Sequence, residues 1–137
     1  MASKIFVNLP VNNLEKTIAF FTSLGFSFNP QFTDDKATCM VISDHIFAML
    51  MTADRFRDFT SKEICDSSRF TEVILSLDAE SREAVNGIVD KALASGATEP
   101  RPTQDYGWMY LRGFQDIDGH LWEIAFMDES AMPAQMG

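Results

Sequence analysis

Alternating apolar and polar residues near the start of the chain predict a β-strand over residues 4–11. Leu9 and Val11 share one face of this strand, and Phe6 and Asn8 share the other. Because a half-apolar strand buries one face against a helix, we expect the Leu9 face to pack and the Phe6 face to remain open.

The next segment has the spacing of an amphipathic helix. Apolar residues recur every three or four positions from Leu14 to Leu24, and Gly25 follows as a stop signal. Asn12 has Glu15 three residues after it, which is a loose capping-box pattern, so we predict that Asn12 caps the helix.

The rest of the chain divides into further strands, one more helix and a linker. The predicted segments are an extended hairpin over 26–42, a strand over 46–52, a mixed loop over 53–69 with one helical turn, a strand over 71–77, a helix from Ser81 to Ser95, and strands over 108–114 and 120–127.

The order strand, helix, strands therefore occurs twice, which predicts an internal duplication. A shift of 66 residues pairs Leu9 with Leu75, and a shift of 75 residues pairs Ala48 with Glu123. We predict an α+β fold of two tandem βαβββ modules. The predicted boundaries make residues 1–137 a single domain, with module 1 at about 4–57, a linker at about 58–69, module 2 at about 70–128 and a C-terminal tail at 129–137.

Two glutamates are the main candidates for chemistry. If the two sheets curl toward each other, Glu72 and Glu123 point into one concavity, where a carboxylate must be paired, hydrogen-bonded, protonated or bound to a metal. Two close carboxylates raise one pKa and supply a general base or a shared proton. The alternative is that both are solvated or paired with Arg69, Arg101 or Arg112.

An aromatic segment supplies a second candidate site. Trp108, Tyr110 and Arg112 alternate along a predicted strand and would share one face. Aromatic rings beside one cation suit a small organic ligand that has an anionic or planar part. Cross-strand packing with an exposed arginine is the structural alternative.

Composition and charge exclude several classes of function. The chain has 11 Lys and Arg against 20 Asp and Glu, a net charge of −9, which disfavours binding to nucleic acid. No apolar run is long enough for a membrane span. Cys39 and Cys65 make no disulfide scaffold, and a reduced, cytoplasmic protein is expected. Zinc spacings such as H-x-x-x-H or C-x-x-C, nucleotide-binding glycine motifs and G-x-S-x-G do not occur.

The chain resembles the vicinal oxygen chelate superfamily in two segments, FVNLPVNNLEKTIAFFTSLGF near its start and FQDIDGHLWEIAFM near its end. The second segment is similar to the superfamily pattern F-x-D-P-D-G-x-x-x-E, with Ile117 in place of the usual proline. The superfamily contains glyoxalase I, bleomycin-resistance proteins, fosfomycin-resistance proteins and extradiol dioxygenases. The resemblance implies paired βαβββ modules that form a curved mixed sheet around a cavity, and it implies a homodimer.

The resemblance also suggests where a metal would bind. It places the ligand positions of metal-dependent members at Phe6, Glu72 and Glu123, with Ala48 as the counterpart of Glu123 in the first module. Phenylalanine and alanine have no donor atoms, and two carboxylates alone bind divalent cations weakly. We therefore expect no cofactor and an incomplete metal site, with Glu72 and Glu123 as weak candidates. A glyoxalase or dioxygenase mechanism needs a metal to polarise or chelate vicinal oxygens.

Three functions remain open. The first, which we predict, is a glyoxalase/bleomycin-resistance-like protein that binds a small organic molecule in an acidic, aromatic-lined cavity without a complete metal site. The second is a lactoylglutathione lyase-like lyase or isomerase, or a dioxygenase-like enzyme, that uses Glu72 and Glu123 as acid and base or as partial metal ligands. The third is a dimeric domain without a ligand. The predicted ligand-binding residues are Phe6, Asn8, Ala48, Leu50, Trp108, Tyr110 and Arg112.

Overall fold

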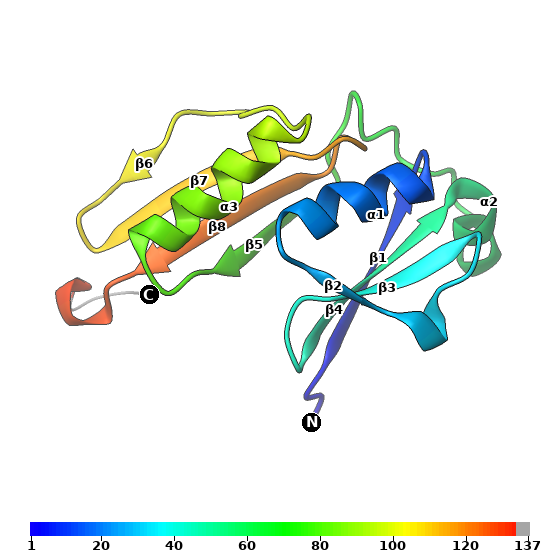
Figure 1. The fold of residues 1–137 in the computed structure, drawn as a ribbon, viewed down its shortest axis with the longest axis horizontal. Coiled ribbons are helices and arrows are strands. Elements are labelled where there is room, and N and C mark those ends of the chain that lie inside the picture. Colours follow the sequence, from blue (N-terminus) through cyan, green and yellow to red (C-terminus); the bar gives the residue numbers. More distant parts are fainter. Residues whose placement is uncertain (134–137) are drawn as a thin grey trace. The chain divides into compact units, whose positions relative to one another are not determined.

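A computed structural model of the chain describes residues 1–133 and forms two compact units, which divide between Asp66 and Ser67. Each unit contains a strand, a helix and three further strands (Figure 1), which confirms the predicted α+β fold of two βαβββ modules. The single-domain boundaries stay a prediction, and residues 134–137 of the predicted tail lie outside the described residues.

The first unit contains β1 (Ile5–Val11), α1 (Leu14–Ser23), β2 (Ser27–Asn29), β3 (Ala37–Val41), β4 (Ile46–Thr52) and α2 (Ala53–Phe56). The second contains β5 (Ile74–Asp78), α3 (Arg82–Ala94), β6 (Gln104–Asp105), β7 (Met109–Gln115) and β8 (Leu121–Met127).

Both sheets are four-stranded and have the same topology. The strand order is β1-β4-β3-β2 in the first unit and β5-β8-β7-β6 in the second. In each unit the first strand pairs parallel to the last, and the other pairs are antiparallel. A parallel pair needs a long crossover, which the helix and the intervening strands provide.

Helix α1 begins one residue later than the capping pattern predicted. Asn13, not Asn12, is the N-cap, and its side-chain Oδ1 accepts a hydrogen bond of 3.0 Å from the backbone N–H of Lys16. The helix buries Leu14, Thr17, Phe20 and Phe21. The apolar periodicity therefore located this helix correctly, although it did not distinguish between two adjacent asparagines.

The core of the first unit follows strand alternation. Leu9 in β1 pairs with Leu50 in β4, and both side chains are almost completely buried. Met40 in β3, which is fully buried, pairs with Ala48 on the same face. This face is the one that the sequence pattern predicted to pack.

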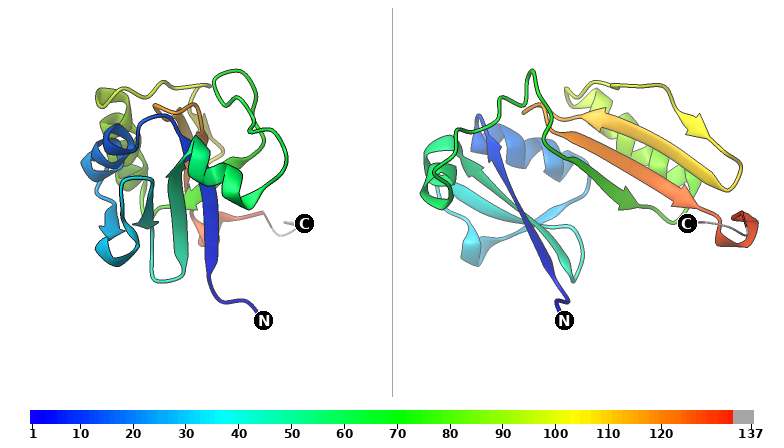
Figure 2. Two further views of the ribbon diagram at one scale, coloured as in Figure 1. Left: turned by 90° about the vertical axis from the view of Figure 1, so that its right-hand side faces the viewer. Right: turned by 180° about the vertical axis from the view of Figure 1, so that it is seen from behind.

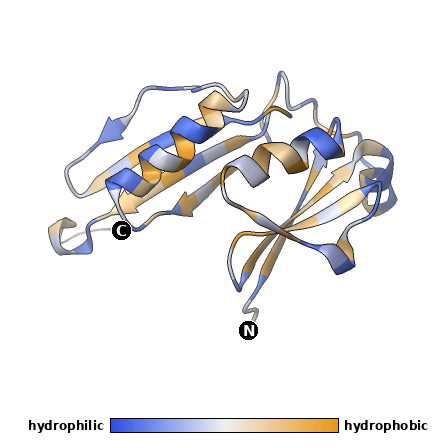
Figure 3. Ribbon diagram, viewed as in Figure 1, coloured by the Kyte–Doolittle hydropathy of each residue, from blue (hydrophilic) through white to orange (hydrophobic). Residues whose placement is uncertain are grey.

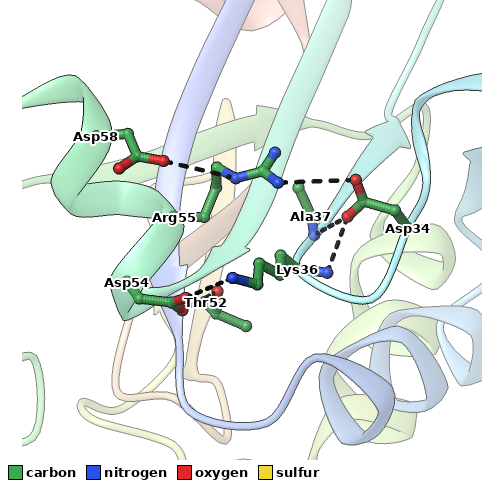
Figure 4. A network of polar contacts seen from close by, with 7 residues as sticks. All are labelled: Asp34, Lys36, Ala37, Thr52, Asp54, Arg55 and Asp58. Atoms are coloured by element: carbon green, nitrogen blue, oxygen red, sulfur yellow. Dashed lines mark hydrogen bonds and ion pairs between the residues drawn. The ribbon is translucent and has the colours of Figure 1, made fainter.

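A network of charged side chains joins α2 to the turn between β2 and β3 (Figure 4). Lys36 Nζ lies 3.0 Å from Asp54 Oδ2, and Arg55 lies 3.8 Å from Asp34 on the turn and from Asp58. Hydrogen bonds from Thr52 and Lys36 lower the pKa of Asp54 to about 2. These exposed contacts fix the segment that follows β4, the region predicted to contain one helical turn.

Helix α3 covers one face of the second sheet. Ser81 caps it by accepting a hydrogen bond of 3.0 Å from the N–H of Ala84, as the sequence predicted. Val85, Val89 and Ala92 are fully buried on the side that contacts β7 and β8. Figure 3 shows polar and apolar residues on different sides of this helix. The short strand β6 was not predicted, because two residues show no periodicity.

Among the helices within residues 1–133, none has the length and apolar character needed to cross a membrane.

Candidate functional site

One face of the second sheet is not covered by α3. Figure 2 shows this face from behind, with the strands in front of the helix. We call it the open face. The register assigns to it Ile74, Ser76 and Asp78 of β5, Leu121, Glu123, Ala125 and Met127 of β8, and Met109, Leu111, Gly113 and Gln115 of β7.

Glu123 is the carboxylate at the centre of the open face. It pairs with Ser76 on one side and with Gly113 on the other, and the Ser76 hydroxyl donates a hydrogen bond of 2.8 Å to Glu123 Oε1. A Cβ atom added at Gly113 would lie 3.0 Å from the backbone oxygen of Trp122 and 3.8 Å from Glu123 Cγ. The glycine therefore leaves space beside the carboxylate that another residue type would fill.

The register does not place Glu72 beside Glu123. The strand predicted over 71–77 begins at Ile74, so Glu72 is an exposed residue before β5. Three residues separate Glu72 from Ser76, and Glu72 lies at a bend outside the strand pairing. Ser76, which the sequence analysis did not include among the site residues, is the polar neighbour of Glu123. The alternation of the strand residues could have identified Ser76, because it places Ser76 and Glu72 on the same face.

Tyr110 and Arg112 face α3 rather than the open face. The Tyr110 hydroxyl lies 2.8 Å from Asn86 Oδ1, and Arg112 forms ion pairs of 2.9 Å with Asp90 and 3.1 Å with Glu99. The Arg112 side chain is 11% exposed. Their polar groups hold the helix and the following loop onto the sheet, and ligand binding by these two residues stays a prediction.

Trp108, the third residue of that predicted set, precedes the first residue of β7 and is half-buried. The three residues therefore do not form one face of a strand. Trp108 contributes its backbone oxygen to a hydrogen bond of 2.7 Å from the N–H of Asp128, which closes the end of the β7–β8 hairpin.

In the first unit the predicted ligand-binding residues lie on two opposite faces. Phe6 and Asn8 are exposed, and the Phe6 ring stacks on Phe47 with 4.8 Å between ring centroids. Ala48 and Leu50 are 0% and 1% exposed on the packed face. These four residues therefore do not share one surface, because residues of opposite parity on a strand point in opposite directions.

Strand parity also corrects the repeat alignment. A shift of 75 residues pairs buried Ala48 with Glu123, which lies on the open face. A shift of 74 residues pairs Ala48 with Trp122, and both side chains are buried. The counterpart of Glu123 is then Met49, which is half-buried on the Phe6 side of its sheet. A change of one residue exchanges the faces of every strand residue.

The donor set does not fit the metal site that the resemblance implies. Phe6 has no donor atom, and both candidate counterparts of Glu123 in the first unit, Ala48 and Met49, lack a carboxylate. Within residues 1–133, no three His, Cys, Asp or Glu side chains are close enough together to hold a metal ion. Glu123 has a serine hydroxyl as its neighbour, and a neutral hydroxyl does not replace an imidazole or a carboxylate as a ligand for borderline metals.

The late motif Asp-Ile-Asp-Gly builds the turn between β7 and β8. Asp116 is 5% exposed, and its carboxylate accepts hydrogen bonds from the N–H groups of Asp118 and His120 and from Trp122 Nε1, at 2.9 to 3.0 Å. Burial raises the pKa of Asp116, whereas nearby His120 and the Trp122 N–H act in the opposite direction. The acidic residue of this motif therefore has a structural role, and it positions the start of β8.

The two units define a paired-module protein of the kind found in the glyoxalase and bleomycin-resistance proteins. Residues 4–43 match the family model described as bleomycin resistance protein-like N-terminal. A hypothetical protein from S. aureus is 26% identical, with a TM-score of 0.77 over 92% of this chain and 95% of that one. A glyoxalase-related enzyme from Fulvimarina pelagi is 19% identical, with a TM-score of 0.77 over 92% of this chain and 88% of that one.

A third similar structure is a genomically encoded fosfomycin resistance protein from Listeria monocytogenes, complexed with Mn(II) and sulfate. It is 21% identical, with a TM-score of 0.66 over 90% of each chain. The search of curated proteins gave no match to this sequence. The family-model match over residues 4–43 and the shared fold confirm the predicted resemblance: the chain has the two-module fold of the glyoxalase, bleomycin-resistance and dioxygenase proteins.

Proposed function

We propose that this protein binds a small organic molecule on the open face of its second unit, with Glu123 as the polar anchor and without a resident metal. The observation that carries the proposal is the Ser76–Glu123 hydrogen bond of 2.8 Å beside Gly113. One Glu123 oxygen is engaged by Ser76, and the other can accept a hydrogen bond from a ligand.

The charge of the chain supports a ligand group that is cationic or a strong hydrogen-bond donor. The net charge is −9, and a carboxylate that is partly removed from water favours a positive partner. The apolar neighbours Leu121 and Ala125, on the same face of β8, suit the carbon skeleton of such a molecule. The family-model match to a bleomycin resistance protein-like segment supports the same class of function.

A ligand screen by thermal shift tests the proposal. Wild-type protein is treated with chelator and screened against aromatic amines, amidines and amino alcohols. A ligand at 100 times its Kd adds about 2.7 kcal/mol to the free energy of unfolding. We expect Glu123→Gln to remove the shift and to unfold at an unchanged temperature, because glutamine still accepts the Ser76 hydrogen bond.

Asp78→Asn is the matched control, since it removes one negative charge from the same face and the same sheet. We expect it to retain ligand binding. Equal loss in both variants would mean that general charge attracts the ligand, and retained binding in Glu123→Gln would refute the proposed anchor.

The enzymatic alternative uses the same carboxylate as a general base. Two observations favour this second function. The Ser76 hydroxyl donates a hydrogen bond to Glu123, and Gly113 leaves space beside the carboxylate. Turnover that Glu123→Gln abolishes, in protein free of metal, would establish it. Turnover that requires added metal would instead indicate that residues other than those named above coordinate a metal ion.

The proposal includes a homodimer, which the superfamily resemblance implies. Sedimentation equilibrium distinguishes the 15.4 kDa chain from a species of twice that mass.

A further inference from the structure

A hollow lies at the end of the open face, beside the turn between β7 and β8. Its volume is about 210 Å³, which is enough for a small organic group. It belongs entirely to the second unit, because its lining comes from the segment 67–71 and from the residues around the turn. The lining residues used in the argument are Ser68, Arg69, Phe70, Thr71, Gln115 and Leu121.

Backbone contacts fix the walls of this hollow. The Ser67 hydroxyl donates a hydrogen bond of 2.6 Å to the backbone oxygen of Asp118. Gly119 has a φ of +94°, and a Cβ atom at this position would lie 2.4 Å from the backbone oxygen of Ser67. The segment 67–71 can pack this closely on the turn only because residue 119 is glycine. The hollow is therefore built by the fold and does not depend on a ligand.

Arg69 gives the hollow a positive charge. Its guanidinium carbon lies 5.2 Å from the centroid of the Phe70 ring, and no ion pair within residues 1–133 involves Arg69. A guanidinium has a planar fork of N–H donors that matches a carboxylate. Gln115 adds amide donors, and Ser68 and Thr71 also line the hollow, although the Thr71 hydroxyl donates its hydrogen bond to the backbone oxygen of Val73.

The charge balance selects the class of anion. One guanidinium neutralises one negative charge, and the surplus of nine negative charges on the chain disfavours a dianion such as phosphate. Phe70 and Leu121 provide apolar surface for the carbon atoms next to the anionic group. We propose that the hollow binds the carboxylate group of a small monoanionic organic acid through Arg69.

The position of the hollow connects it to Glu123. Leu121 lines the hollow, and Glu123 is two residues further along the same face of β8, a distance of about 7 Å. The inference deepens the proposed function and rests on it in one respect, that a single ligand reaches both groups. That ligand carries a carboxylate at one end and a cationic or hydrogen-bond-donating group at the other.

Benzoate is the probe that tests the anion subsite separately from Glu123. We expect titration of the full-length, ¹⁵N-labelled protein to shift the amide signals of residues 67–71, 115 and 119–121. Arg69→Gln should weaken benzoate binding by about tenfold or more, because the charge-assisted hydrogen bonds are lost. Arg101→Gln, an equal change of charge on an exposed loop of the same unit, should leave benzoate binding unchanged.

Two further probes define the chemistry of the subsite. Benzamide, the neutral analogue of benzoate, and inorganic phosphate should each bind at least about tenfold more weakly than benzoate. The inference is overturned if benzoate shifts no amide signals of the hollow, if Arg69→Gln binds it as wild type does, or if phosphate binds as tightly. A urea unfolding curve of Arg69→Gln that matches wild type shows that any loss is not a folding defect.

The same titration separates the inference from the proposed function. Glu123→Gln should retain benzoate binding and lose the amine ligands found by thermal shift. If benzoate binds through Arg69 while Glu123→Gln has no effect on any amine, the anion subsite stands and the Glu123 anchor fails. An amino acid carries both a carboxylate and an amine. If such a molecule binds no more tightly than benzoate, Arg69 and Glu123 do not bind one ligand together.

Discussion

The residue that defines the candidate site has an unusual position for a carboxylate. Glu123 lies between Trp122 and Ile124, which are 2% and 1% exposed, in the strand at the centre of its sheet. Alternation alone turns its side chain to the open face, where Ser76 donates a hydrogen bond to it. The carboxylate is half-exposed on that face, so the Ser76 hydrogen bond offsets only the part of its hydration that the strand removes.

Asp116 is the acidic residue whose role is structural, and its removal should lower stability. In Asp116→Asn an amide NH₂ replaces one of the two oxygens that accept hydrogen bonds from Trp122 Nε1 and two backbone N–H groups. A buried donor left without an acceptor costs about 1–3 kcal/mol. We expect a loss of that size in the free energy of unfolding, measured with urea.

Glu129→Gln provides the comparison, since Glu129 is an exposed acidic residue in the same unit. It should change the unfolding free energy by less than about 0.5 kcal/mol. If Asp116→Asn is no less stable than Glu129→Gln, the turn does not depend on the carboxylate.

At the scale of elements, the start of α1 depends on one of two neighbouring asparagines. Asn13 accepts the hydrogen bond from the N–H of Lys16. We expect Asn13→Ala to reduce the free energy of unfolding by about 1 kcal/mol and Asn13→Ser to recover most of it, because serine is also a favourable N-cap. Urea denaturation of the three proteins measures both effects, and an equal loss in both variants would contradict the assigned cap.

The ion pair between α3 and the β6 region makes a pH-dependent contribution to the free energy of unfolding. Arg82 Nη1 lies 2.6 Å from Asp105 Oδ2, and hydrogen bonds from Arg82 and from the N–H of Gly107 lower the pKa of Asp105 to about 2. Its usual value is 3.8, so the unfolded chain takes up the proton first as the pH falls. The contribution to stability is therefore present above about pH 5 and is lost as the pH falls toward 2.

Urea midpoints of wild type and Asp105→Asn across this range test the contribution. We expect wild type to be the more stable protein at pH 6, and the difference should shrink steadily below pH 4. A difference that stays constant down to pH 2 would show that the pair does not titrate as described.

The elements were more predictable from the sequence than the site. Periodicity located α1, α3 and β4, because each buries a long regular apolar stripe. The site depends on strand parity and register, which a shift of one residue reverses, and this explains why Ala48 was paired with Glu123. Tyr110 and Arg112 were assigned to a ligand because the sequence does not show which face of β7 lies under α3.

At the scale of the whole molecule, the two units repeat one architecture with different chemistry. Glu123 and Ser76 occupy the open face of the second sheet, whereas the first unit carries Phe6 stacked on Phe47 on the face opposite its core. A duplicated fold in which only one copy retains a carboxylate at this position is suited to holding a ligand by one polar anchor and apolar surface. The chain therefore shares the fold of its structural neighbours, while the donor atoms within residues 1–133 do not make up the metal-ligand set that the resemblance implies.

The independence of binding from metal is the central claim, and isothermal titration calorimetry tests it most directly. The amine ligand selected by thermal shift is titrated into wild-type protein with excess EDTA and into protein with added Mn(II), Zn(II) or Ni(II). We predict the same Kd, within about twofold, in every case, because the proposed anchor is the Glu123 carboxylate itself and not a metal ion. Binding that disappears in EDTA and returns with one metal would contradict the account.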